Sequence, residues 1–441
     1  VTVEKLRSYQ RAEAWTGVYF PDARALGGET RAAWIPWRAL LRRIPAVWLG
    51  APFGTAETPQ PHALLGADDT PHPAFAALAR EMTALKAGPG ALLLHADPEK
   101  PAVLVYDSHA SRHFNDVDRE PGTSRDAQRG WVDCLEWLRV PWAFADRQRL
   151  GMLDDPACRV LVLPRCTALD DMEIAAMARF AGRGGLLLAD VLPAVADGHG
   201  ALREDFPLAP LFEEPPVPSG APEGDTPPAP KALLLDRLLP PRDAGGDRSR
   251  IPADYVRVRE FLTRAGFPEP VILPEDFDGE ARLLTYGNTR LLALLASPEA
   301  AQEQRVRLPF GKDDTVYDVR AGVPVTRPHR ATVRLAPGET RLYARTESAV
   351  GEIALAAPAS AAAGTRLEMR AAVTPRKGAP GRHLLRFEVM TGGTAAQPWQ
   401  RRLVDCPAGA GECQIPLARS EALGRCLVRV TDVLSGVFAE A

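Results

Sequence analysis

Four short apolar runs in the middle of the chain constrain its fold more than any other feature. Segments with the period of an α-helix separate them, and the first of these segments has Ser124 as its expected N-cap. Strands that alternate with helices in this way run parallel, so the pattern predicts a doubly wound, flavodoxin-like parallel sheet over residues 96–205. The expected strands lie at 102–106, 140–144, 159–163 and 184–190, and the expected helices lie at 124–138 and 170–180.

The chain after residue 250 has a different pattern. Apart from one helix at 255–265, it consists of short runs with the two-residue period of half-buried strands, separated by Gly, Pro and Asp turns. Strands at this spacing predict two antiparallel β-sandwich domains, at 251–346 and 347–441. The preceding segment, 206–250, contains proline-rich stretches that cannot hold a sheet ladder, so we expect a linker there.

The first 95 residues contain too little of a parallel sheet to form a domain alone. We expect a helix with a proline kink at 29–43, a short strand at 44–50 and a second helix at 73–86. A buried strand of this kind needs neighbours on both sides, so we expect its partners to lie before Val1. We also expect residues 1–95 to be loosely held, because their apolar strand lacks those partners.

Charge and cysteine content argue against several classes of function. The 53 basic and 56 acidic side chains give a formal net charge of −3, which argues against a nucleic-acid partner held by bulk charge. No apolar run approaches the roughly 20 residues of a membrane-spanning helix. The six cysteines form no C-x-x-C pair, so we expect neither a zinc site nor a disulfide scaffold.

Cys406 and Cys413 are the one pair of cysteines that could face each other across a turn. A disulfide would form there only if the protein is exported, and the alternative is a pair of reduced thiols. The sequence does not identify the compartment, although export or a periplasmic location is favoured over the cytoplasm.

Several stretches become recognisable through their order along the chain. They are a Trp-rich helix and strand within 34–85, Val162-Leu-Pro-Arg-Cys-Thr-Ala-Leu-Asp-Asp, Phe180-Ala-Gly-Arg-Gly-Gly-Leu-Leu-Leu-Ala-Asp, Val316-Tyr-Asp-Val-Arg-Ala-Gly and Leu335-Ala-Pro-Gly-Glu-Thr-Arg-Leu-Tyr-Ala. Together they resemble the glycoside hydrolase family 42 β-galactosidases. On this resemblance, residues 1–95 are the truncated C-terminal end of a (β/α)8 barrel, and residues 96–205 are the trimerisation domain.

The resemblance implies a retaining cleavage of β-galactosides by two glutamates at the ends of the fourth and seventh barrel strands. Such chemistry needs two carboxyl groups about 5–5.5 Å apart. If 44–50 is the eighth strand, the acid/base glutamate lies outside this sequence, and Glu13 is the candidate nucleophile. The alternatives are that Glu13 is a surface carboxylate, or that 15–20 is the seventh strand with Asp22 at its tip.

Three further residues are candidates for contact with the sugar. Trp48 ends the expected eighth strand, where its ring could stack on a sugar or pack in the barrel core. The resemblance assigns Glu57 and His62 to hydrogen bonds with galactose hydroxyls. They stand further apart than the family's pair, which makes a solvated loop the competing interpretation.

The domain at 96–205 lacks the motifs of a catalytic or nucleotide-binding domain. Cys166 follows a strand but has no Gly-x-Cys-x-Gly elbow, which argues against an amidotransferase nucleophile. No Gly-x-Gly-x-x-Gly follows Tyr106, so a dinucleotide site is not expected. His109, His113 and Asp116 could form a metal cluster, but loop residues at such an edge usually face water. We therefore expect no cofactor and no metal.

This domain is instead expected to mediate contact between subunits. Four aromatic residues on and beside its first long helix exceed what one buried helix face needs, and Trp is common at interface hot spots. We predict a homo-oligomer formed through 96–205, with internal packing of these side chains as the alternative. The four residues are Trp131, Trp137, Trp142 and Phe144.

The sequence thus predicts the C-terminal portion of a glycoside hydrolase that acts on β-linked sugars. The alternative is a non-enzymatic cell-surface or assembly protein that keeps the scaffold without the two catalytic carboxylates. Whether the intact protein is an enzyme stays open, and we predict that this chain alone is inactive. The expected partners are a carbohydrate substrate and other copies of the protein, with no nucleic acid and no membrane span.

Overall fold

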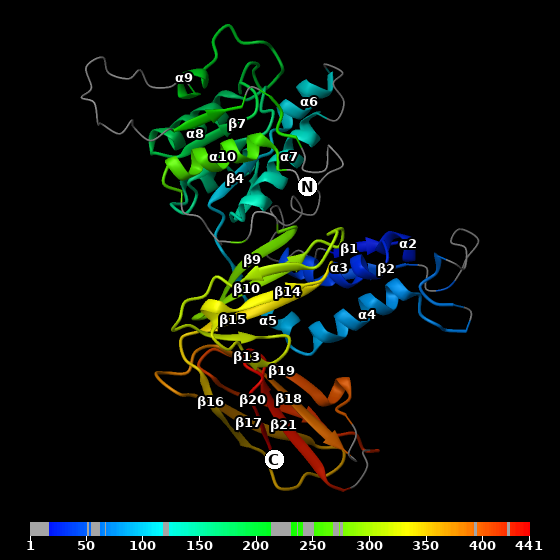
Figure 1. Ribbon diagram of the computed structural model, residues 1–441. Helices are drawn as coiled ribbons and strands as arrows, with labels where there is room; N and C mark the ends of the chain where they lie inside the picture. The colour runs from blue at the N-terminus through cyan, green and yellow to red at the C-terminus, as the bar shows by residue number, and fades with distance from the viewer. Residues whose placement is uncertain are drawn as a thin grey trace. The chain divides into compact units, whose positions relative to one another are not determined.

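The computed structural model describes residues 17–50, 53, 62–66, 68–117, 123–212, 231–235, 237–240, 251–267, 273, 277–391, 395–420 and 424–441. These residues form two compact units (Figure 1). Unit 1 is described over residues 100–267, and unit 2 over residues 17–99 and 273–441. None of the described helices combines the length and apolar character needed to cross a bilayer.

Unit 1 is built on a five-stranded parallel sheet, as the alternation of strands and helices predicts. Its strands are β4 (Val103–Tyr106), β5 (Trp142–Ala145), β6 (Val160–Leu163), β7 (Leu186–Ala189) and β8 (Ala232–Leu234). They lie in the order β5-β4-β6-β7-β8, and every neighbouring pair is parallel. Strand β8 lies inside segment 206–250, which we expected to be a linker, so that expectation is wrong for residues 232–234, which follow the proline-rich stretches.

Helices cover both faces of this sheet because its strands are apolar on both sides. Val103 and Val105 face a core shared with α7 and α10, whereas Leu104 and Tyr106 face a core shared with α8. Ser124 lies within α7 rather than at its N-cap, and its hydroxyl accepts a hydrogen bond from the Asn115 amide at 2.9 Å. The helices are α6 (His109–Val117), α7 (Thr123–Leu138), η2 (Arg147–Asp154), α8 (Asp171–Gly182), α9 (Ala209–Phe212) and α10 (Ala253–Arg264).

The four aromatic residues predicted to mediate self-association are all buried inside unit 1. Trp131 and Phe144 have no exposed surface, and Trp137 and Trp142 keep 7% and 2% of theirs. They pack against the sheet and against α10, a helix in the segment predicted to begin a β-sandwich. The inference from these side chains to an interface is therefore wrong, because α10 supplies the apolar surface that they were expected to find on another subunit.

The N-terminal part of unit 2 contains two short parallel strands, β1 (Gly17–Phe20) and β2 (Ala46–Leu49), which pair in register. Helix α3 contains the predicted Pro36. Gly88, at φ 149°, ends the second long helix, but the chain then continues into a further helix whose first residue is Pro89. The four helices are α2 (Ala23–Leu26), α3 (Glu29–Leu41), α4 (Pro73–Lys86) and α5 (Pro89–His95).

Antiparallel sheets form the rest of unit 2, as the two-residue period predicts. The first group is β3 (Asp97–Pro98), β9 (Gly279–Tyr286), β10 (Thr289–Ala296), β11 (Gln304–Arg307), β12 (Thr315–Asp318), β13 (Val323–Pro324), η3 (Pro328–Arg330), β14 (Thr332–Leu335) and β15 (Thr340–Thr346). They form a six-stranded sheet, β13-β12-β15-β10-β9-β3, and a two-stranded antiparallel sheet, β11-β14. One apolar core joins this two-stranded sheet to the larger sheet.

The last strands of the chain form two further antiparallel sheets that enclose one core. They are β16 (Val350–Ala356), β17 (Arg366–Pro375), β18 (His383–Thr391), η4 (Pro398–Gln400), β19 (Arg401–Cys406), β20 (Ala410–Pro416), β21 (Cys426–Asp432) and β22 (Phe438–Glu440). The sheet orders are β16-β17-β20 and β19-β18-β21-β22. Cys406 and Cys413 lie on strands of different sheets, and both are free thiols, so no disulfide joins them.

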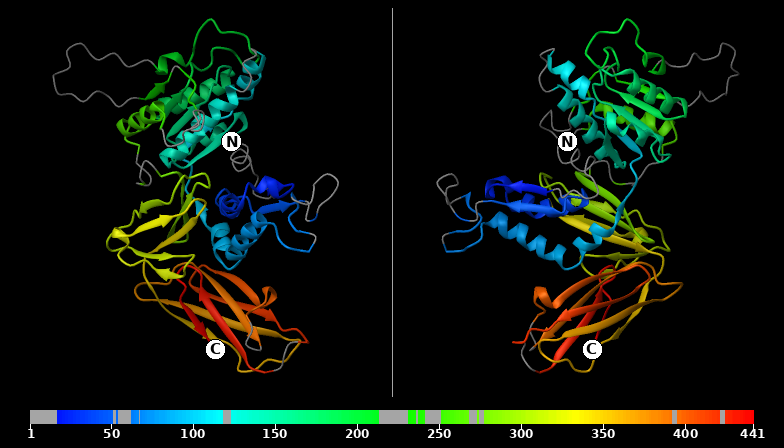
Figure 2. Two further views of the ribbon diagram at one scale, coloured as in Figure 1. Left: turned by 45° about the vertical axis from the view of Figure 1, so that its right-hand side comes forward. Right: turned by 180° about the vertical axis from the view of Figure 1, so that it is seen from behind.

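The helices at the start of unit 2 pack firmly onto its sheets (Figure 2). Trp37, Leu93 and Tyr286 belong to one core that joins α3 and α5 to β9. The buried Arg42 guanidinium donates to the Glu280 carboxylate at 2.6 Å, which links α3 directly to β9. For α3 and α5 this packing argues against the expectation that the segment is loosely held, because the antiparallel sheet covers faces that would otherwise be exposed.

Candidate functional site

The pair β1-β2 presents two aromatic side chains on one face. Tyr19 and Trp48 are register partners, as are Phe20 and Leu49 in the next row. Phe20 and Leu49 pack against the helices, so Tyr19 and Trp48 lie on the opposite face, because successive side chains alternate along a strand. Tyr19 is 61% exposed and Trp48 is 52% exposed. Both lie near the carboxyl ends of their strands.

Glycine residues make room for these two rings. A Cβ atom on Gly17 would lie 2.6 Å from the Trp48 ring, and one on Gly50 would overlap the Tyr19 hydroxyl group. Each ring therefore lies close to backbone that has no side chain of its own. The Trp48 ring thus lies over Gly17 at the start of β1, and the Tyr19 ring reaches Gly50 just after β2.

The structure describes two of the four residues predicted for the sugar site. Trp48 lies at the carboxyl end of β2, and His62 is half-buried in the segment between β2 and α4. Ala63 and Leu64, which follow His62, are buried. Glu13 and Glu57 lie outside the described residues.

Asp22, the alternative carboxylate, follows β1 and caps a helix. One of its carboxylate oxygens accepts from the Ala25 amide at 3.1 Å, and the other accepts from the Arg24 guanidinium at 2.6 Å. The bond to Arg24 lowers the pKa of Asp22. Its hydrogen bonds fit a residue that begins α2, and they do not suggest a nucleophile held ready for a sugar.

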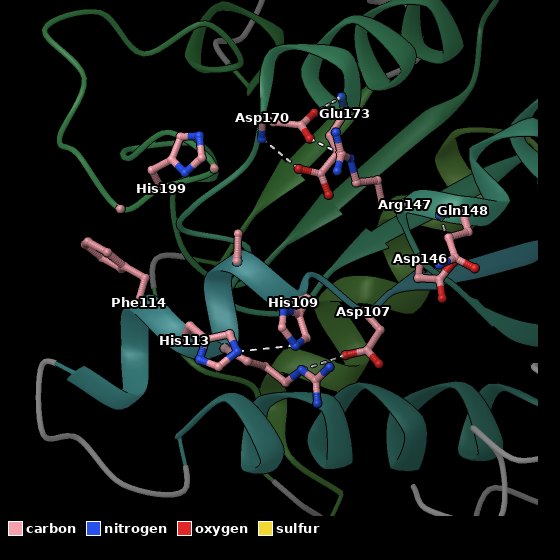
Figure 3. A pocket seen from close by; sticks show the side chains of 14 residues that line it. Asp107, His109, His113, Phe114, Asp146, Arg147, Gln148, Asp170, Glu173 and His199 are labelled. Atoms are coloured by element: carbon pink, nitrogen blue, oxygen red, sulfur yellow. Dashed lines mark hydrogen bonds and ion pairs between the residues drawn. The ribbon is translucent and has the colours of Figure 1, made fainter.

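A second site lies in unit 1, at the carboxyl edge of the parallel sheet. Strands β4 and β6 are neighbours, but the chain continues from β4 to β5 on one side and from β6 to β7 on the other. The loops that follow β4 and β6 therefore lead away from each other and leave a crevice between them. Open parallel sheets bind ligands in the crevice at such a point. A pocket of about 900 Å³ opens there (Figure 3), lined by Asp107, His109, Ala110, Arg112, His113, Phe114, Asp146, Arg147, Gln148, Asp170, Glu173, Gly198, His199 and Gly200.

The acidic groups of this pocket are held by specific partners. Asp170 and Glu173 form a capping box at the start of α8, and Arg147 pairs with Asp170 at 2.7 Å. The buried Tyr106 hydroxyl donates to Glu173 from below, and burial raises the pKa of both groups. Asp107 accepts from the Gln128 amide at 2.8 Å. The carboxylates are therefore fixed in position before any ligand arrives.

Two histidines from successive turns of α6 line the same pocket. The Nε2 atoms of His109 and His113 are 3.2 Å apart, and their rings meet edge to face (Figure 3). Among the described side chains, no three His, Cys, Asp or Glu groups are arranged to hold a metal ion. The side chain of Asp116, the third residue considered for a metal cluster, lies outside the described part.

Cys166 lies below this pocket and does not line it. Its side chain is fully buried, and burial raises the pKa of its thiol well above the usual value. A nucleophilic cysteine needs an accessible thiolate, so the structure agrees with the missing glycine elbow. Beside it, burial raises the pKa of Asp190 to about 6, while the Arg165 amide and the Trp131 indole donate to its carboxylate.

The carboxylates Asp146, Asp170 and Glu173 of this pocket were not predicted as site residues, whereas its histidines His109 and His113 were considered for a metal site. A partial signal was present, since Asp107 follows the expected strand 102–106 directly and Asp146 comes two residues after the expected strand 140–144. The carboxyl ends of parallel strands meet at one edge of a sheet, so these residues had to come together.

Comparisons with known proteins reveal a likeness of fold. No protein family model matches the sequence, and no curated protein matches it. Among solved structures, a β-galactosidase from Bacillus circulans sp. alkalophilus matches 72% of this chain with a TM-score of 0.53 at 10% identity. A catalytic mutant of Gan42B, a GH42 β-galactosidase from G. stearothermophilus, matches 72% with a TM-score of 0.51 at 12% identity. The β-galactosidase from Rahnella sp. R3 matches 72% with a TM-score of 0.51 at 13% identity.

The matches cover 52%, 50% and 51% of these three proteins. The chain therefore spans about half the length of the structures that it matches. At such low identity the likeness concerns the fold alone and does not transfer the roles of residues. The fold of this chain is similar to that of the glycoside hydrolase family 42 β-galactosidases.

Proposed function

We propose that this chain is the C-terminal portion of a glycoside hydrolase that acts on β-linked sugars with retention of configuration. The observation that supports this most is the exposed aromatic face of Tyr19 and Trp48 at the carboxyl ends of β1 and β2. Barrel enzymes bind substrate at the carboxyl ends of their strands, and aromatic faces stack on the apolar side of sugar rings.

The proposal includes a barrel completed by polypeptide outside the described residues. Among the described strands, β1 and β2 pair only with each other, which leaves two open edges on a short parallel sheet. Two four-residue strands do not form a stable sheet alone, and parallel sheets are normally covered on both faces. Further strands at these edges would place Tyr19 and Trp48 inside the barrel mouth.

In this proposal the chain contributes sugar contacts and at most one catalytic carboxylate. Glu13 remains the proposed nucleophile, although β1 begins after it in the sequence and Asp22 follows that strand as a helix cap. Glu57 and His62 are proposed to bind sugar hydroxyl groups. The role of Asp22 also favours the second candidate, a non-enzymatic protein that keeps the scaffold without the two carboxylates.

Self-association through residues 96–205 also remains part of the proposal. The buried tryptophans no longer support it. Its remaining support is that Met172 and Leu202 expose 53% and 75% of their surface within this domain, where an oligomer would cover them.

The test is hydrolysis of 4-nitrophenyl β-galactoside by the intact protein from its complete gene. We expect the change Trp48→Ala to lower kcat/KM about tenfold, which corresponds to about 1.4 kcal/mol of lost stacking. Trp399→Ala is the matched control, because Trp399 is 55% exposed but lies outside the proposed site. Equal effects of the two changes, or no hydrolysis of any aryl β-glycoside, would overturn the proposal.

A further inference from the structure

The pocket at the β4/β6 crevice has the construction of a ligand site, although the proposed hydrolysis makes no use of it. Its volume of about 900 Å³ is within the usual range for small-molecule sites. Three of the eight histidines in the chain line it, His109, His113 and His199. Side chains from four loops and from α6, η2 and α8 converge there, which is more than the sheet needs to end its strands.

The charges around the pocket argue against an anionic ligand. Carboxylates outnumber guanidinium groups four to two among its lining residues. Arg147 is paired with Asp170 at 2.7 Å, and Arg112 lies 3.4 Å from Asp107. A phosphate would therefore meet more negative than positive charge.

The start of α6 is also unsuited to bind a phosphate. Its backbone is not glycine-rich, and the Ser108 hydroxyl already accepts from the Ser111 amide at 3.0 Å. Phosphate sites in folds of this kind rely on free amides in a glycine-rich turn before the helix. One of the amides needed for such a cradle is thus already in use.

A neutral, polyhydroxylated ligand fits the same groups well. The fixed carboxylates of Asp170 and Glu173 accept hydrogen bonds, and the Arg112 and Arg147 guanidinium groups and the imidazoles donate them, which matches ligand hydroxyls that both donate and accept. Partners within the protein orient these groups, so binding costs less side-chain entropy.

One phenyl ring, that of Phe114, also lines the pocket and could stack on a sugar ring. Phe114 is half-buried on α6, and Gly200, at φ 86°, brings the 198–200 turn against it, where a Cβ atom would lie 3.4 Å from the ring. His113 and His199 lie on either side of Phe114 in the close view (Figure 3). We propose that this pocket binds a neutral carbohydrate, as a second sugar site that does not depend on the proposed hydrolysis.

The test is saturation-transfer NMR on the purified chain with galactose, glucose, mannose and lactose at millimolar concentrations. We expect at least one of these sugars to bind, and the changes His113→Ala and Phe114→Ala to weaken that binding at least tenfold. Both residues have surface access, so thermal unfolding of each variant should match the wild type. Trp399→Ala is the control and should leave this binding unchanged, because Trp399 is 55% exposed and lies outside both proposed sites.

The outcomes separate this inference from the proposed hydrolysis. Sugar binding that is lost in Trp48→Ala but kept in the pocket variants would overturn the second site and support the barrel site. Binding of none of the four sugars would also overturn it. Binding of inorganic phosphate or Zn²⁺ that His113→Ala abolishes would show that the ligand class is wrong.

Discussion

Removal of the Glu280 carboxylate should destabilise the join between the helices and the sheets of unit 2. Glu280 accepts from Arg42 at 2.6 Å and from Arg38 at 2.8 Å, and Arg282 lies 3.8 Å away. The Arg42 side chain is 2% exposed. Burial alone would raise the pKa of Glu280, but the three guanidinium groups hold it well below its usual value.

The expected cost follows from what the substitution leaves behind. Glu280→Ala removes the carboxylate from a cluster of three guanidinium groups, one of them buried. Breaking a buried ion pair from one side typically costs about 3–5 kcal/mol, because a buried charge loses its compensation. We expect a loss of that size in the free energy of unfolding of unit 2, with faster hydrogen exchange in α3.

The assay is guanidinium chloride unfolding at neutral pH, together with hydrogen exchange of the amides of α3. Glu412→Ala is the control, because Glu412 pairs with Arg370 at 3.2 Å while both side chains are at least 75% exposed. This exposed pair should contribute at most about 1 kcal/mol. Because the pKa of Glu280 is lower in the folded than in the unfolded state, its ionised carboxylate stabilises the fold at pH values above the unfolded-state pKa. The difference in the free energy of unfolding between wild type and Glu280→Gln should therefore shrink below about pH 4. A loss in Glu280→Ala no larger than in Glu412→Ala would refute the reasoning.

Three further predictions concern both units. Burial raises the pKa of Asp190 to about 6, so the carboxyl group must lose its proton at an energetic cost as the pH rises. The wild type should therefore lose up to roughly 3 kcal/mol of stability relative to Asp190→Asn between about pH 4 and about pH 7. A difference in the free energy of unfolding that does not change with pH would contradict this. The 441-residue chain alone should not hydrolyse aryl β-glycosides, and turnover abolished by a point mutation within the chain would show otherwise. The intact protein should sediment as an oligomer that Leu202→Glu weakens, and a monomer at micromolar concentration would exclude this.

The sequence predicted the elements whose period was clear. The first four strands of the parallel sheet are continuous apolar runs between amphipathic helices, and each appears within two residues of its expected start. Strand β8 was missed because it is three residues long and follows a proline-rich stretch. Helix α5 was missed because Gly88-Pro89-Gly90 was interpreted as a stop, whereas Pro89 is a favourable first residue of a new helix.

Long-range packing explains the other differences between the sequence-based predictions and the structure. Trp131 and Trp142 are buried because α10, more than a hundred residues away in sequence, returns to the same sheet. The pocket of unit 1 was missed for a related reason, since it depends on the order of the strands, which local periodicity does not specify. Sequence position alone did place Trp48 at the end of its strand. It could not show that Tyr19 lies beside Trp48 on the same face.

A crystal structure of the intact protein with a bound, unhydrolysed β-galactoside would test the proposed sugar site most directly. We predict that the sugar ring lies against Trp48 and Tyr19, at the carboxyl ends of β1 and β2, with a pair of carboxyl groups about 5–5.5 Å apart around its glycosidic bond. A galactoside bound elsewhere on the protein, or a Trp48–Tyr19 face covered by the protein's own side chains, would contradict the proposal.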